Sequence, residues 1–478
     1  MASAVPMRPK TPLAERDLLT FFFAVSLVVF LTQALNSGRL WAVGWVALGV
    51  LALVLQRRST ARFVLILELP ILINLLSYSA STLYLTHERQ DYDFTNDPVA
   101  TQAAWVALGG LASFLAGLAV VVLRPAQRWQ SEAPPVRMTP QQALVLYVIG
   151  LINMEGISRI APVSIAAIAY TFGLCVPLSL FIYLQLAMDS ERRWVGTAPF
   201  YLWLAALGLW SLRSMLGGIF GSTLLILAIF ITQQIRRSYI FAIIGLTCAA
   251  LLIPLIQDTK SSYRQRLASG VQASERALQT VVAENFRKTF LEGDLETYRN
   301  GLTQLAERLC TFDIWLRVKR HMELHQDFAK GGTILDALIF GFIPRIFWPD
   351  KPITGGANTL AEQYADMLIA ENTSVGVGMI SEFYINGGTW AVLLGMFGLG
   401  LIGGGALMRG WFDNVQPLGT MSGILAFSLL VRADSNLADV LGGFLRVLFL
   451  WGVFRFWIIR RSRRKTSVPA FAANAPLP

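Results

Sequence analysis

Long apolar stretches recur along the chain, separated mostly by short polar connections. Twelve can be counted, at residues 18–35, 40–56, 63–85, 100–123, 141–157, 163–187, 198–213, 217–234, 239–257, 388–408, 418–431 and 437–459. About 20 apolar residues in a helix cross the hydrocarbon core of a bilayer, where a helix satisfies its own backbone groups. The pattern predicts an all-α, polytopic membrane helix bundle of about twelve transmembrane helices, of which 141–157 and 418–431 are shorter than a typical span.

Composition and charge support a membrane protein and give it an orientation. Hydrophobic residues make up 54% of the chain and charged residues only 15%, against roughly 25% charged in a soluble domain. Nineteen Lys and Arg lie in the short loops and tails on one side of the predicted spans, and five lie on the other. Basic residues accumulate on the cytoplasmic side. We therefore expect a multi-pass protein of a bacterial inner membrane with both termini in the cytoplasm, and we assign the net charge of +10 to topology rather than to nucleic-acid binding.

One connection is much longer than the others. The expected division is transmembrane helices 1–9 in residues 1–257, a periplasmic loop region with short helices in 258–387, transmembrane helices 10–12 in 388–465, and a disordered cytoplasmic tail in 466–478. Apolar periodicity predicts helix over 264–330, interrupted at Gly293 and ended by Gly331–Gly332. Loops of this length usually have a function.

The run Pro344–Pro352, with the sequence PRIFWPDKP, combines three prolines with aromatic and charged residues. Proline restricts the backbone, and aromatic side chains suit a membrane interface. A rigid interfacial loop would hold Arg345, Asp350 and Lys351 in place, and an Arg beside a Lys suits phosphate oxygens. The alternative is an amphipathic anchor whose charges face water.

The second run, ISEFYINGG at 380–388, lies immediately before the tenth predicted span. Glu382 would lose hydration there, and it could act as a general base or hold an arginine. Alternatively, it is an acid at a helix N-terminus, stabilised by the helix dipole.

Further candidates lie at the outer ends of predicted spans. Lys260, Tyr263 and Arg264 follow the ninth span, and Arg213 ends the seventh. These cations could share an outer pocket, or they could be ordinary flanking charge. His321 could act as a base near neutral pH, although a solvated helix face is the default for its charged segment. The chain has only three histidines and three cysteines, and neither a metal-ligand cluster nor a disulfide framework is apparent.

Taken in this order, the two runs resemble those of the Wzy-type oligosaccharide repeat-unit polymerases, which include O-antigen and exopolysaccharide polymerases. Many members carry PR-x-x-WP-x-KP followed by GE-x-Y-x-N-x-G. Here Ser381 replaces the usual glycine, and Gly387 stands where an aromatic residue is common. The resemblance implies a GT-C-like, metal-independent membrane glycosyltransferase without a cofactor. It would transfer the growing glycan from polyprenyl pyrophosphate to the non-reducing end of another lipid-linked repeat unit.

The resemblance also assigns roles. Cations near the outer boundary would stabilise the leaving pyrophosphate, and Tyr263 and Trp348 would add contacts to the substrate. Candidate bases, in order of preference, are Glu382, Asp350 and His321. Expected partners are the lipid-linked donor and acceptor, the bilayer, and by analogy a Wzz-type chain-length regulator and a Wzx-type flippase. Two alternatives stay open: an O-antigen ligase-like glycan transferase, and a flippase or transporter of lipid-linked oligosaccharide.

Overall fold

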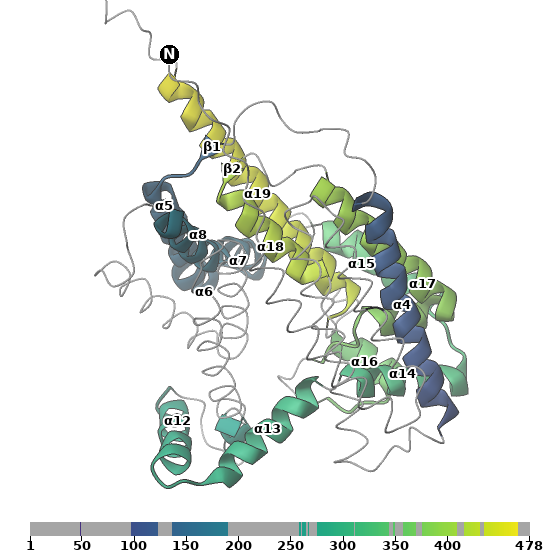
Figure 1. Cartoon of the computed structure of the whole chain (residues 1–478). Helices are drawn as coiled ribbons and strands as arrows, with labels where there is room; N and C mark the ends of the chain where they lie inside the picture. Colours follow the sequence, from purple (N-terminus) through teal and green to yellow (C-terminus); the bar gives the residue numbers. More distant parts are fainter. Residues whose placement is uncertain are drawn as a thin grey trace, which may run out of the picture. The chain divides into compact units, whose positions relative to one another are not determined.

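The computed structural model describes most of the second half of the chain and part of the first. The described residues are 48, 97–122, 136–189, 258–259, 261–263, 266, 275–309, 311–343, 348, 357–369, 375–408, 415–430 and 435–466. Most of them are helical (Figure 1), which confirms the predicted helical fold class. The chain divides into one unit of Met1–Asn36 and Ser211–Leu305 and another of Ser37–Trp210 and Ala306–Pro478.

In the first unit, two amphipathic helices make up most of the described residues of the predicted outer loop. They are α12 (Glu275–Phe290) and α13 (Leu295–Leu309), the last residues of which enter the second unit. Gly293, with φ of 69°, makes the turn between them as predicted. The Asn285 amide donates to Asp258 Oδ2 at 2.7 Å, which fastens α12 to the start of the 258–266 segment.

The second unit contains three helices that are long and apolar enough to cross a membrane. They are α4 (Pro98–Val122), α17 (Met379–Met408) and α19 (Leu437–Thr466). Their candidate membrane-spanning stretches, Pro98–Val121, Met379–Gly405 and Leu437–Ser462, overlap the predicted spans at 100–123, 388–408 and 437–459, although the second begins nine residues earlier than predicted. Membrane association therefore follows from the length and composition of these helices.

The full set of twelve spans is not supported by the described residues. The run at 141–157 forms α5 (Pro140–Leu151) and a π-helix, η1 (Ile152–Ile157), and then continues into α6 (Ser158–Ile160). The predicted span at 163–187 is divided at Leu174 into α7 (Val163–Gly173) and α8 (Cys175–Asp189). The run at 418–431 forms α18 (Leu418–Leu430). The predicted spans at 18–35, 40–56, 63–85, 198–213, 217–234 and 239–257 lie outside the described residues, as does all of the predicted tail beyond Thr466.

The backbones of α4 and α17 come unusually close to each other. A Cβ on Gly400 would lie 2.1 Å from the Phe114 carbonyl oxygen, and one on Gly117 would lie 2.2 Å from the Phe397 carbonyl oxygen. Gly110 faces Val392 while Gly404, further along, faces Val121, so the two helices run parallel. Small residues permit such close approach between helices in a membrane.

Other elements gather at the two ends of this pair. The helices α14 (Thr311–His325), α15 (Gly332–Phe342) and α16 (Ala357–Ala365) follow one another in the chain, and α14 packs against α4, α16 and α17. After the opposite ends of α4 and α17, the strands β1 (Val136–Arg137) and β2 (Val415–Gln416) pair in parallel.

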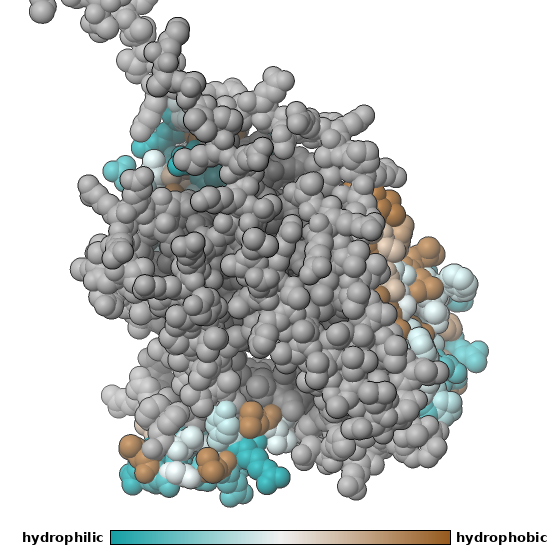
Figure 2. All heavy atoms as spheres, in the orientation of Figure 1, coloured by the Kyte–Doolittle hydropathy of each residue, from teal (hydrophilic) through white to brown (hydrophobic). Residues whose placement is uncertain are grey.

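The outward faces of these helices remain apolar. Trp390 and Leu394 of α17 are 75% and 70% exposed, and Phe456 of α19 is 65% exposed. Figure 2 shows apolar side chains along the edge that α4 and α17 occupy in Figure 1. Lipid would cover such faces in a membrane-spanning bundle.

The glycine contact gives a direct test. Gly400→Ala should destabilise the protein by about 1–3 kcal/mol, because the new methyl group meets backbone atoms of α4 that cannot move aside. Gly398→Ala is the matched control, since no described atom lies within 4 Å of its Cβ position and alanine favours helix by about 1 kcal/mol. Thermal unfolding of the purified protein in detergent measures both. Equal melting temperatures for the two variants would contradict the close packing.

Candidate functional site

The polar end of the second unit is the region where α14 packs against the beginnings of α4 and α17. It is built around a break in α17. The helix is interrupted at Gly387 and Gly388, where the backbone is not helical and Gly388 has φ of 64°. Glycine adopts this left-handed conformation without the steric cost of a side chain. The Ala329 N–H donates to the Ile385 carbonyl at 2.9 Å. This break lies at 387/388, where the sequence predicted the boundary between the outer region and the tenth span, and the apolar helix Met379–Gly405 extends on both sides of it.

Glu382 lies in the first turns of α17 and is 1% exposed. One carboxylate oxygen, Oε2, accepts a hydrogen bond from the Leu437 N–H at the beginning of α19. The first N–H groups of a helix have no partner inside that helix, and a carboxylate also suits the positive end of the helix dipole. Its other oxygen, Oε1, is buried and makes no direct hydrogen bond to a described residue, although the Thr333 side chain lies close enough to interact with the carboxyl group.

Asn386 lies one turn after Glu382 and is also buried. Its Nδ2 donates to Thr333 Oγ1 at 2.6 Å and to the Glu382 carbonyl oxygen at 2.7 Å. Its Oδ1 has no partner in the described part of the chain. Residues four apart share one helix face, so the Glu382 and Asn386 side chains bring two unpaired acceptor oxygens to the same face. Unpaired acceptors are costly when buried, and together they suit a ligand that donates hydrogen bonds.

A second polar cluster surrounds His321 of α14. Its Nδ1 lies 3.0 Å from Asp366 Oδ2, and its Nε2 lies 3.6 Å from Asp327 Oδ1. The His325 ring lies 4.5 Å from the His321 ring, and the Tyr364 ring meets it edge-on at 6.0 Å. Burial, and then the nearby Asp327 charge, raise the pKa of Tyr364, so this phenol stays protonated at neutral pH.

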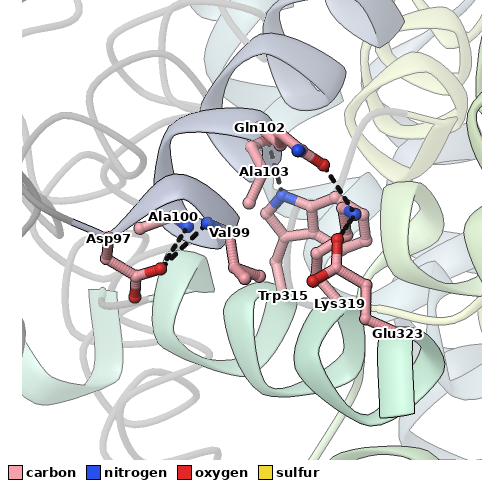
Figure 3. Close-up of polar contacts among 8 residues, drawn as sticks. All are labelled: Asp97, Val99, Ala100, Gln102, Ala103, Trp315, Lys319 and Glu323. Atoms are coloured by element: carbon pink, nitrogen blue, oxygen red, sulfur yellow. Dashed lines mark hydrogen bonds and ion pairs between the residues drawn. The ribbon is translucent and has the colours of Figure 1, made fainter. Parts of the chain in front are cut away.

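Between these clusters and α4, a set of polar contacts fixes α14 (Figure 3). The Trp315 indole N–H donates to the Ala103 carbonyl at 2.9 Å, and Lys319 Nζ donates to Gln102 Oε1 at 3.3 Å. Lys319 also pairs with Glu323 and lies 5.2 Å from the centre of the Tyr384 ring. Burial alone would lower the pKa of Lys319, but its bonds to Glu323 and Tyr384 outweigh burial and raise it. Lys319 is therefore a charged structural link between three helices.

The N-terminus of α4 is capped by Asp97, which also holds α14. Asp97 Oδ1 accepts from the Val99 N–H at 2.9 Å and from the Ala100 N–H at 3.2 Å, while Oδ2 pairs with Arg320. Burial would raise the pKa of Asp97, but Arg320 and the two N–H groups together lower it below its ordinary value of 3.8.

The predicted site residues divide into those that the structure describes and those that it does not. Glu382 and His321 are buried in the two clusters, Tyr263 is partly buried, and Trp348 is 37% exposed. The remaining six lie outside the described residues: Arg213, Lys260, Arg264, Arg345, Asp350 and Lys351.

Sequence reasoning overlooked Asn386 and Thr333 as site residues. Asn386 could have been found from its spacing of four residues after Glu382. Thr333 could not, because it lies 53 residues from Asn386 in sequence. In the described part of the chain, no three His, Cys, Asp or Glu side chains stand in position to hold a metal ion as they are.

The role of Asp97 predicts that the stability difference between wild type and an Asp97→Asn variant depends on pH. Because the folded-state pKa of Asp97 is lowered, its stabilisation is present above about pH 4 and is lost as pH falls through the folded pKa. Asp97→Asn keeps an oxygen for the cap but removes the ion pair, so it should cost about 0.2–1 kcal/mol at pH 7. The difference in melting temperature from wild type should shrink as pH falls below 3.8. A difference that stays constant from pH 7 down to pH 3 would contradict this role.

Comparison with known proteins gives one match. A family model described as Domain of unknown function (DUF8712) matches residues 59–406. No curated protein and no solved structure matches the chain. The matched region contains α4, α14, α15, α16 and most of α17. Since it extends over well more than half of the 478 residues, the chain belongs to the family described as Domain of unknown function (DUF8712).

Proposed function

We propose that the protein polymerises lipid-linked oligosaccharide repeat units at the outer face of a bacterial inner membrane. The observation that supports this proposal best is the buried pair of Glu382 and Asn386. Each has one acceptor oxygen that makes no direct hydrogen bond to a described residue, at the polar end of apolar helices. A sugar hydroxyl is a hydrogen-bond donor of the kind that such oxygens would accept.

The direction of the helices supports placing this end at the outer face. The helices α4 and α17 run parallel, and the N-terminus of α19 meets the first turns of α17, so all three begin at one end. In the proposed twelve-span topology, spans four, ten and twelve all run inward, which agrees with this arrangement. Five basic residues lie in Arg460–Lys465 near the other end of α19, where the cytoplasmic side would lie.

The proposed reaction is glycosyl transfer from polyprenyl pyrophosphate. A hydroxyl at the non-reducing end of the acceptor attacks the anomeric carbon of the donor glycan and gives its proton to a base. The bond between that carbon and the pyrophosphate oxygen breaks, and polyprenyl pyrophosphate leaves with both bonding electrons. Glu382 Oε1 is the preferred base, followed by Asp350 and His321, because proton transfer requires a group within hydrogen-bond reach.

The negative charge on the leaving group requires fixed cations. Arg345 and Lys351 are proposed for this role because they lie, in sequence, between α15 and α16. Of these two helices, α15 packs against α17 and α16 packs against α14. Arg213, Lys260 and Arg264 are further proposed contacts to the pyrophosphate. In the first unit, Asn285 bonds to Asp258 and Thr259, which directly precede Lys260. Tyr263 and Trp348 are proposed contacts to the glycan.

A transporter is the second candidate, and the break in α17 favours it. Transporters commonly bind substrates where a membrane helix is interrupted, and here the polar pair directly precedes the interruption at Gly387 and Gly388. An O-antigen ligase-like transferase would use the same donor with another acceptor, so its site would share the same chemistry. Coupling to a Wzz-type regulator and a Wzx-type flippase is part of the polymerase proposal.

Replacing Glu382 by glutamine separates its chemical role from its structural one. Glutamine keeps an oxygen that can accept from the Leu437 N–H but lacks a basic carboxylate, so polymer formation should fall by about 10²–10⁴-fold. Glu362→Gln is the control, because Glu362 is an exposed carboxylate on α16. Arg345→Ala should also abolish polymer, through loss of a cation. Glycan gels of cells that lack the protein and carry each variant measure the effect.

The pattern of products distinguishes the candidates. Single repeat units should accumulate without the protein, and only wild type and Glu362→Gln should restore long chains. Normal chain length with stably expressed Glu382→Gln would reject Glu382 as the base. Long polymer left on its carrier lipid in cells without the protein would indicate a ligase, and loss of single units from the outer face would indicate a flippase.

A further inference from the structure

The end of α14 brings together two histidines and an aspartate. His321 and His325 are four residues apart and therefore lie on one face of the helix, with their rings 4.5 Å apart and tilted by 43°. Asp327 follows in the loop after the helix, and its Oδ1 faces His321. None of the described contacts of this cluster takes part in the packing of α14 against α4.

His321 is held in the orientation of a metal ligand. Its side chain is 9% exposed, and Nδ1 lies 3.0 Å from Asp366 Oδ2. A carboxylate accepts hydrogen bonds, so Nδ1 carries a proton, and in the neutral ring Nε2 is then the nitrogen available to a metal. This buried Nε2 has no hydrogen-bond partner among the described residues. Histidines that bind metals commonly donate their other ring N–H to a carboxylate in this way.

The position of Asp327 fits a second ligand. Its Oδ1 lies 3.6 Å from His321 Nε2, which is too long for a hydrogen bond. Two tetrahedral ligands with bonds of about 2.0–2.1 Å to zinc lie about 3.4 Å apart. An ion can therefore bridge these two atoms with little movement of either side chain.

The third ligand has to move into place. As the side chains stand, no three of them enclose an ion in the described part of the chain. His325 is exposed, however, and an exposed side chain changes rotamer rapidly. Rotation of its ring toward His321 would complete a set of two imidazoles and one carboxylate, with water at the fourth position.

We propose that His321, Asp327 and His325 bind one transition-metal dication of the Zn²⁺ type, with Asp366 orienting His321. Imidazole ligands select such ions over Mg²⁺ and Ca²⁺, which prefer sites made of oxygen alone. The ion fastens the loop after α14, and this loop supplies the Ala329 N–H that bonds to Ile385 beside the break in α17. The site does not depend on the proposed polymerase. It gives His321 Nε2 to the metal, which leaves Glu382 and Asp350 as candidate bases.

Metal titration of the full-length, tag-free protein in detergent tests the site. After treatment with a chelator, wild type should bind one Zn²⁺ per chain in calorimetry, and bound Co²⁺ should show the strong visible absorption of tetrahedral coordination. His325→Ala and Asp327→Asn should each weaken binding at least 10-fold, and Asp366→Asn should weaken it about 10–100-fold. Leu324→Ala is the control, since this residue is 80% exposed on the same turn and should leave binding unchanged.

His325 and Asp327 are exposed, so their variants should fold normally, and equal melting temperatures in chelator check this. Absence of stoichiometric binding by wild type would overturn the proposal. Binding of the same affinity in wild type, His325→Ala and Asp327→Asn would also overturn it, because the ion would then lie elsewhere.

Discussion

The close contact between α4 and α17 determines how the polar end of the second unit is assembled. Helices in lipid gain little from the hydrophobic effect when they associate, so they depend on close packing. Gly117 and Gly400 allow each backbone to approach the other, and the contact fixes the helices in parallel. Their N-terminal ends are then adjacent, and α14 can bind both: Trp315 bonds to the α4 backbone, and its ring packs edge-on against Tyr384 of α17.

The break at Gly387 and Gly388 places polar chemistry beside an apolar span. Before it, α17 carries Glu382 and Asn386, and the candidate membrane span Met379–Gly405 continues through the break. Glu382 has two possible functions that use different oxygens. Oε2 caps α19 and fixes the carboxylate, whereas Oε1 makes no direct hydrogen bond to a described residue. A fixed, buried carboxylate with one such acceptor is a suitable starting arrangement for a base, because its position does not have to be organised during the reaction.

The sequence predicted what depends on local pattern. The three long apolar helices and the turn at Gly293 follow from hydropathy and from glycine, and the structure has them. At Gly387–Gly388, where the sequence predicted the end of the outer loop, the structure has a break inside α17. The span expected at 163–187 was wrong as a single helix, because hydropathy alone does not register the interruption at Leu174.

The site was harder to predict because its contacts join distant parts of the chain. Glu382 was identified as a site residue, but its bond to Leu437 spans 55 residues. Glu382 does lie in the first turn of its own helix, α17, as the alternative interpretation predicted. Its carboxylate, however, accepts a hydrogen bond from the first N–H of a different helix, α19. His321 was treated as a single histidine since Asp366, its partner, lies 45 residues away. His325 and Asp327 lie close to His321 in sequence, but they become candidate metal ligands only because Asp366 orients the His321 ring.

Reconstitution with the natural substrate tests the central claim, that this polar end carries out glycan transfer. Purified protein would be placed in vesicles with lipid-linked oligosaccharide extracted from cells that lack it, and chain length, released polyprenyl pyrophosphate and leaflet distribution would be followed. The account predicts longer glycans together with one polyprenyl pyrophosphate released for each unit added. Movement of the oligosaccharide between leaflets without chain growth would contradict it.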